Sequence, residues 1–78
     1  MRQPVDSIEA YWTIDGKIVP LRFTCMGRRV RVADVGRSWK DDEGRHILCM
    51  LQDQRVCELV LDAEGLWWFI PPAGPANA

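Results

Sequence analysis

The stretch IEAYWTIDGKIVPLRFT, residues 8–24, indicates a β-hairpin. Its first half alternates apolar residues with others, which is the period of a strand that rests one face on a core. The residues predicted to face the core are Ile8, Ala10, Trp12 and Ile14. The Asp15-Gly16 pair then predicts a type I′ turn, because that turn needs positive φ at both central positions.

The returning half of the hairpin, residues 17–24, alternates in the same way. It places Val19, Leu21 and Phe23 on the core side. Pro20 interrupts the pattern, since proline has no N–H to donate to a neighbouring strand. We therefore expect this strand to lie at a sheet edge or to carry a bulge at Pro20.

Four further strands follow from the same reasoning. The third begins at Arg29, and its apolar phase changes between Val32 and Val35, which predicts a bulge near Ala33-Asp34. The others are predicted over residues 46–52, 56–61 and 66–70, with turn residues between them.

Six short strands without an amphipathic helix predict an all-β fold, an antiparallel meander that closes into a small SH3-like barrel. A flat meander that dimerises through its exposed face is the alternative. The 78 residues allow a single domain, residues 1–78. We expect its ordered core at about residues 6–71 and a flexible tail at 72–78.

The composition excludes several classes of protein. With 47% hydrophobic and 27% charged residues, the chain is unlike disordered proteins. No apolar run approaches the ~18 residues of a membrane span. The opening MRQPVDSIEA lacks the apolar region of a signal peptide. We therefore expect a cytoplasmic protein without a membrane partner.

The histidine and the cysteines do not form a recognisable catalytic or metal motif. Cys25, Cys49 and Cys57 lack the CxxC spacing, and His46 is the single histidine. His46 has no nucleophile at a motif spacing, so we expect a structural role for it. The prediction is a non-enzymatic protein with no cofactor and no metal, whose three thiols are free.

The pairing of the two later strands stays open. A three-residue loop between them would place Cys49 opposite Cys57, whereas a two-residue loop would place Cys57 opposite Met50.

Positive charge is concentrated in residues 22–45, which carry seven Lys or Arg and four Asp or Glu. Arg29 and Arg31 share one face of a strand at a spacing of roughly 6.5–7 Å, which suits successive phosphates. A tryptophan among cations is typical of a surface that binds single-stranded nucleic acid. The residues predicted to contact nucleic acid or a protein partner are Arg28, Arg29, Arg31, Arg37, Trp39 and Lys40.

Four tryptophans in a short chain suggest a second candidate surface. Because adjacent strand residues point to opposite faces, either Trp67 or Trp68 faces the core and the other faces outward. Exposed aromatic residues often mark an interface. We predict such an interface at Tyr11, Trp67 and Phe69, with a homodimer as one form of it. The alternative is that the chain covers these aromatic residues itself.

The motifs VPLRFTCMGRRVRVADV (residues 19–35), Trp39, VCEL (56–59) and GLWWF (65–69) resemble a small bacterial all-β domain without an assigned activity. That family occurs alone or attached to proteins similar to Y-family translesion polymerases. The resemblance implies a binding or accessory module in DNA repair. Cys25, Val30 and Cys57 stand where the family has aromatic residues, so no aromatic binding surface carries over from it.

Overall fold

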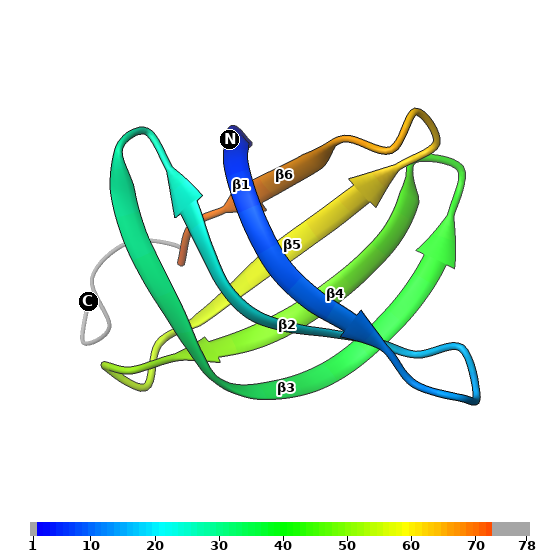
Figure 1. The fold of residues 1–78 in the computed structure, drawn as a ribbon, viewed down its shortest axis with the longest axis horizontal. Coiled ribbons are helices and arrows are strands. Elements are labelled where there is room, and N and C mark those ends of the chain that lie inside the picture. The colour runs from blue at the N-terminus through cyan, green and yellow to red at the C-terminus, as the bar shows by residue number, and fades with distance from the viewer. Residues whose placement is uncertain (1, 73–78) are drawn as a thin grey trace.

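The computed structural model describes residues 2–72, which form six antiparallel strands (Figure 1). The strands are β1 (Gln3–Trp12), β2 (Ile18–Cys25), β3 (Arg28–Asp41), β4 (Gly44–Leu51), β5 (Val56–Asp62) and β6 (Trp67–Ile70). Each strand pairs with the next along the chain, and β1 pairs with β6 to close a barrel. The predicted all-β meander and its closure are confirmed, and the flat alternative is wrong. Residues 2–72 contain no helix that is long and apolar enough to cross a membrane.

The barrel has two halves, one formed by β1, β2 and the start of β3, and the other by the rest of β3 with β4, β5 and β6. The strands β1 and β3 each pair with both halves. β1 pairs with β6 at Gln3 and Pro4 and with β2 along the rest of its length. β3 pairs with β2 from Arg28 to Arg31 and with β4 from Val32 onward. The bend of β3 visible in Figure 1 coincides with a register shift between Val32 and Asp34, so the predicted bulge is confirmed. A second shift follows between Val35 and Ser38.

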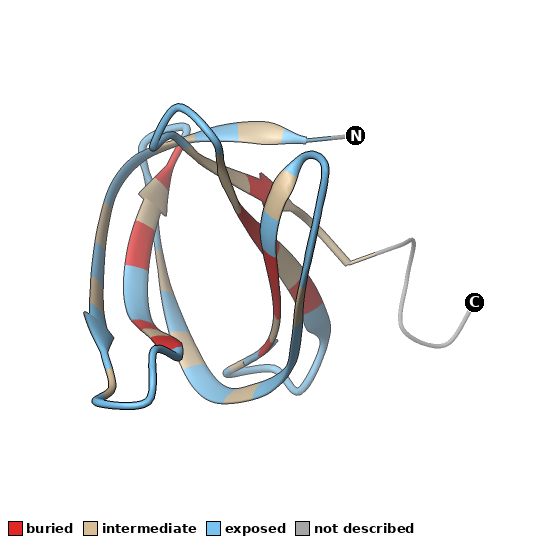
Figure 2. Ribbon diagram, turned by 90° about the vertical axis from the view of Figure 1, so that its right-hand side faces the viewer, coloured by how far each residue is buried: buried red, intermediate tan, exposed pale blue. Residues whose placement is uncertain are grey.

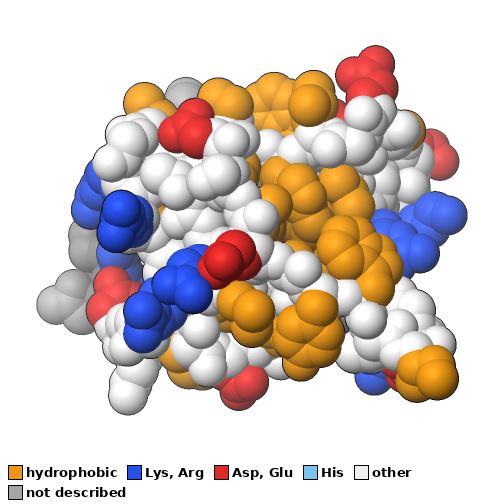
Figure 3. Space-filling model, viewed as in Figure 1, with side chains coloured by type: hydrophobic (Ala, Val, Ile, Leu, Met, Phe, Trp, Pro, Cys, Tyr) orange, Lys and Arg blue, Asp and Glu red, His pale blue; other side chains and the backbone are white. Residues whose placement is uncertain are grey.

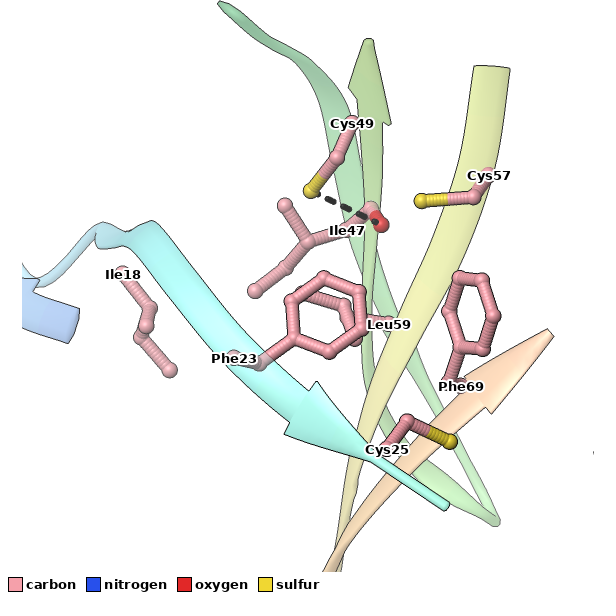
Figure 4. Close-up of a cluster of buried hydrophobic side chains, with 8 residues drawn as sticks. All are labelled: Ile18, Phe23, Cys25, Ile47, Cys49, Cys57, Leu59 and Phe69. Carbon is pink, nitrogen blue, oxygen red and sulfur yellow. Dashed lines mark hydrogen bonds between the residues drawn. The ribbon is translucent and has the colours of Figure 1, made fainter. Parts of the chain in front are cut away.

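The core lies inside the barrel: Figure 2 marks the buried positions along the strands, and Figure 4 shows their side chains gathered between them. Its buried members are Ile18, Phe23, Cys25, Ile47, Cys49, Cys57, Leu59 and Phe69. The rings of Phe23 and Phe69 meet across the barrel with centroids 5.1 Å apart. Because Phe23 is on β2 and Phe69 on β6, this contact holds the two halves of the barrel together.

The first hairpin differs from the prediction in its turn and in two core positions. Its turn is a three-residue loop in which the Gly16 N–H donates to the Thr13 carbonyl, and only Gly16 has a positive φ. The predicted type I′ turn at Asp15-Gly16 is therefore wrong, whereas Met26 and Gly27 between β2 and β3 do both have positive φ. Trp12 and Ile14 are 57% and 107% exposed, because they lie at the open end of the barrel and in the turn.

Both features expected at Pro20 are confirmed: it pairs with β1 alone, so it lies at a local sheet edge, and a bulge adjoins it. Glu9 pairs with Arg22 and Ala10 with Pro20, so Leu21 is the extra residue of β2. The bulge reverses the phase of the strand: Pro20 is buried, while Leu21 is 45% exposed. Val19, opposite Tyr11, is on the outer side as well. The prediction that Val19 and Leu21 face the core is wrong for this reason.

The open register of the later hairpin is settled by its three-residue loop, residues 52–54. Cys49 pairs directly with Cys57, and both side chains are buried. At the start of the chain, β1 begins at Gln3, before the expected start of the ordered core at residue 6. The predicted flexible tail lies outside the described residues except for Pro72.

Candidate functional site

The outer face of β1, β2 and β3 carries polar and aromatic side chains in three rows that run across the strands. The rows, taken from the strand pairing, are Ser7–Thr24–Arg29, Glu9–Arg22–Arg31 and Tyr11–Val19. Successive rows are two residues apart along β1, which corresponds to roughly 6.5–7 Å. We call the outer side of these three rows the β1–β3 face.

The first row combines two hydroxyl groups with a cation. The Oγ of Ser7 and the Oγ1 of Thr24 are 2.9 Å apart and share a hydrogen bond. Arg29 follows next to Thr24 on β3 and is exposed. Hydroxyl groups and a guanidinium side by side offer several hydrogen-bond donors to a single anionic oxygen group.

The second row is a carboxylate followed by two arginines. Glu9 forms an ion pair with Arg22, which leaves Arg31 as the outermost cation of the row. Within residues 2–72, no salt bridge includes Arg29 or Arg31. Both guanidinium groups are therefore free to bind a partner.

A groove of about 440 Å³ lies along the first two rows. Its lining is Ser7, Ile8, Glu9, Arg22, Phe23, Thr24 and Arg29. Figure 3 shows charged side chains of both signs on this side of the molecule, next to hydrophobic side chains gathered over the end of β1. The exposed hydrophobic residues of this face include Tyr11 and Leu21, and Trp12 is exposed at the end of β1 with the parity of the core face. The β1–β3 face thus joins an apolar end to a basic end.

The six residues predicted from the sequence as one basic surface are divided. The bend of β3 between Val32 and Asp34 separates Arg37, Trp39 and Lys40 from the first three, and the alternation of side chains along β3 separates Arg28 from Arg29. Arg29 and Arg31 are on the β1–β3 face, but Arg28 lines a hollow at one end of the barrel. The Arg37 guanidinium lies 5.6 Å from the ring centre of Trp39, beside β4. Lys40 lines another hollow next to the β1–β2 turn. The expectation of one continuous surface from Arg28 to Lys40 is therefore wrong.

The predicted aromatic interface is also divided. Phe69 is 9% exposed and belongs to the core, and Trp67 packs against that core. The outward member of the pair is therefore Trp68, whose Nε1 donates to Asp62 at 2.9 Å. Only Tyr11, 51% exposed, lies at the surface as predicted. The exposure predicted for Phe69 and Trp67 is wrong because their strand positions face inward.

Sequence reasoning missed Trp12 and Leu21 as surface residues. Leu21 could have been found from Pro20, because a bulge at Pro20 reverses the phase of the residues beside it. Trp12 carried no such signal: its parity is that of the core face, and its exposure comes from its position at the open end of the barrel.

A second polar cluster surrounds His46 on the outer side of β4. The His46 ring stacks on Trp39 with an angle of 2° between the planes and 5.0 Å between centroids. Its Nδ1 lies 2.5 Å from Glu58 and its Nε2 lies 2.8 Å from Asp41. His46 is 5% exposed although it points outward, because these side chains cover it.

The surroundings of His46 favour its protonated form. Burial lowers the pKa of His46, but the hydrogen bonds to Glu58 and Asp41 outweigh burial and raise the pKa above its ordinary value. The hydrogen bond from His46 lowers the pKa of Asp41 in turn. With both ring nitrogens bound to carboxylates, neither is available as a general base.

The three thiols lie inside the barrel and are free. Burial, followed by the charge of Asp6, raises the pKa of Cys25. The neighbouring Cys57 and burial raise the pKa of Cys49 as well. The hydrogen bond from Cys49 instead lowers the pKa of Cys57. The raised pKa values make Cys25 and Cys49 poor nucleophiles and poor metal ligands at neutral pH. Within residues 2–72, no group of three or more His, Cys, Asp or Glu side chains is arranged to hold a metal ion.

Comparison of the chain with family models, with curated proteins and with solved structures gave no match. The resemblance to a bacterial domain associated with translesion polymerases therefore stays a prediction.

Proposed function

We propose that this protein is a non-enzymatic binding module, an SH3-like barrel that binds single-stranded nucleic acid across its β1–β3 face. The observation that carries the proposal is the position of Arg29 and Arg31. Both are exposed on one face, and neither belongs to a salt bridge within residues 2–72. A role as an accessory module in DNA repair agrees with the resemblance noted in the sequence.

The spacing of the two cations suits an extended polyanion. Residues two apart on one strand face are separated by roughly 6.5–7 Å, so Arg29 and Arg31 can contact successive phosphates of an unstacked strand. One of the Ser7 and Thr24 hydroxyls donates to the other, and the remaining O–H, in the same row as Arg29, adds a donor for a phosphate oxygen. These contacts depend on the backbone of the nucleic acid and not on its sequence.

The apolar end of the face supplies a platform for bases. Tyr11 is 51% exposed and lies in the row next to Glu9 and Arg22. A base that stacks on an exposed aromatic ring gains about 1–3 kcal/mol whatever its identity. Tyr11 and the two arginines together therefore favour a single strand over a duplex, whose bases are not free to stack.

Acidic residues near this segment in the sequence are directed elsewhere by the fold. Asp34 pairs with Met50 on β4, and residues 41–43 lie at the turn between β3 and β4. Glu9 is the carboxylate within the three rows, and Arg22 neutralises it. The positive potential from Arg29 and Arg31 therefore remains on this face.

The test is a titration of a fluorescent single-stranded oligonucleotide of about 20 nucleotides, followed by anisotropy at low and moderate salt. We expect binding that weakens steeply as salt rises, because bound phosphates release counterions. R29Q/R31Q should lose most of the affinity. K17Q/R37Q, which removes two positive charges from other parts of the barrel, is the matched control and should bind nearly as well as the wild type.

Two results would overturn the proposal. One is no binding at tens of micromolar protein in low salt. The other is an equal loss of affinity in R29Q/R31Q and K17Q/R37Q, which would mean that only the net charge of the protein matters.

Self-association is a second candidate, favoured by the exposure of Tyr11, Trp12 and Leu21. These side chains are 51%, 57% and 45% exposed and belong to neighbouring strands. Exposed apolar side chains at the end of a sheet frequently form interfaces between copies of a protein. Sedimentation at high concentration, with W12S/L21S as the variant, tests it: a wild type that stays monomeric contradicts a homodimer.

A further inference from the structure

The end of the barrel that carries the β2–β3 and β4–β5 turns is hollow. This end lies on the left in Figure 1, where β6 also finishes. The hollow has a volume of about 410 Å³ and is lined by residues from both turns and by Pro71 and Pro72. Its size falls within the range of ~300–1,000 Å³ that is typical of small-molecule sites.

The floor of the hollow is apolar. It is formed by Cys25, Val30, Leu51 and Phe69, which belong to the core or pack against it. Cys25 and Phe69, both labelled in Figure 4, come from β2 and β6, the two strands that pair with β1. A ligand seated here would place an apolar body against these side chains and displace water from them.

Two cations stand around this apolar floor. Arg28 follows the β2–β3 turn and Arg55 follows the β4–β5 turn, and both line the hollow. The Nε of Arg55 donates to Asp53 at 2.7 Å, which leaves its two terminal nitrogens for another acceptor. No salt bridge within residues 2–72 includes Arg28, and the lining described for the hollow contains no carboxylate.

We propose that this hollow binds a small amphipathic carboxylate, with its apolar body against Phe69 and its carboxylate between Arg28 and Arg55. A guanidinium binds a carboxylate through charge-assisted hydrogen bonds that a neutral head group cannot match. The bond between Asp53 and Arg55 orients the guanidinium without closing the hollow. The site is separate from the β1–β3 face and does not depend on nucleic-acid binding.

The experiment is an NMR titration of the labelled protein with octanoate, with octan-1-ol as the neutral probe of equal length. We expect octanoate to shift the signals of Cys25, Val30, Leu51 and Phe69. Octan-1-ol should bind about tenfold more weakly or worse, which is the usual cost of losing hydrogen bonds to a charged group. R28Q and R55Q should each weaken octanoate binding by about tenfold, whereas K17Q should leave it unchanged.

Three outcomes would overturn the proposal: equal affinity for octanoate and octan-1-ol, shifts centred on another part of the barrel, or no shifts at millimolar octanoate. Arg28 and Arg55 are exposed, so we expect R28Q and R55Q to fold normally. A spectrum like that of the wild type would verify this for each variant. R28Q and R55Q should also bind single-stranded DNA like K17Q does, so failure of this site is distinguishable from failure of the proposed function.

A chemical readout gives an independent check. Cys25 lines the hollow, whereas Cys49 and Cys57 are not part of its lining. Octanoate should therefore slow the alkylation of Cys25 by iodoacetamide at alkaline pH, where this thiol ionises in spite of its raised pKa, as measured by mass spectrometry of the digested protein. An unchanged rate for Cys25 at saturating octanoate would contradict the proposed position of the ligand.

Discussion

The Nδ1 of His46 lies 2.5 Å from the Oε2 of Glu58, across two neighbouring strands on the outside of the barrel. The opposite nitrogen of the ring is held by Asp41, and Trp39 covers the ring face. A histidine held between two carboxylates is stabilised in its protonated form. The cluster therefore links β3, β4 and β5 in a way that depends on pH.

The stability of the protein should fall as pH rises above neutrality. The pKa of His46 is raised above its ordinary value of 6.5, so the folded state holds this proton more tightly than the unfolded state. The contribution of the His46 proton to the free energy of unfolding is complete below about pH 6.5, and it is lost as the pH rises through the folded-state pKa. Urea unfolding from pH 6 to 9 measures the loss. H46Q should show a flatter profile over this range; a wild-type profile as flat as that of H46Q would contradict the prediction.

The pKa of His46 should depend more on Glu58 than on Asp41. Hydrogen bonding to Glu58 is the largest of the effects that raise this pKa, and the Glu58 side chain is 22% exposed against 47% for Asp41. E58Q should therefore lower the His46 pKa further than D41N does, as followed by NMR of the imidazole protons. A larger shift in D41N would reverse this assignment.

Asp41 should affect the stability of the folded protein at acid pH. The hydrogen bond from His46 holds the pKa of Asp41 below its usual 3.8. Its contribution is present above about pH 3.8 and is lost as pH falls through the lower, folded-state pKa. D41N should remove this part of the acid sensitivity in urea unfolding between pH 2 and 5. If the free energy of unfolding of D41N and of the wild type fell equally steeply between pH 5 and pH 2, the prediction would be contradicted.

Gly44 should not tolerate a side chain. A Cβ at this position would lie 2.1 Å from the Leu61 carbonyl oxygen, and the φ of Gly44 is +138°. Because the obstacle is backbone, we expect Gly44→Ala to cost at least about 3 kcal/mol of unfolding free energy. Gly16→Ala is the control: nothing lies within 4 Å of a Cβ there, so only the φ of +87° opposes it, at about 1–2 kcal/mol. Equal losses in urea unfolding would refute the steric argument.

Leu59 should be among the most sensitive core positions. Its side chain is 0% exposed and lies in the buried cluster between the two halves of the barrel. Leu59→Ala should destabilise the protein by about 2–5 kcal/mol, through lost burial and the cavity left behind. Leu66→Ala removes the same atoms from a side chain that is 54% exposed and should cost less than about 0.5 kcal/mol. A thermal or urea melt of both variants decides the comparison.

The candidate site was predictable in part. Arg29 and Arg31 share an outward face because side chains alternate along a strand, and this local rule holds at their positions. Arg37 and Lys40 were assigned to the same surface by their proximity in the sequence. The bulges of β3 and its change of partner from β2 to β4 remove them from it.

The sequence by itself determined the all-β class, the six strands, their meander order and the bulges near Pro20 and Ala33-Asp34. These features follow from local chemistry: alternation, proline without an N–H, and turn residues. Only the tertiary structure decided that Trp67 faces the core, that Trp12 is exposed, and that His46 lies between Glu58 and Asp41. Each of these depends on strand register and on closure of the barrel, because contacts between residues distant in the chain form only when the whole sheet closes.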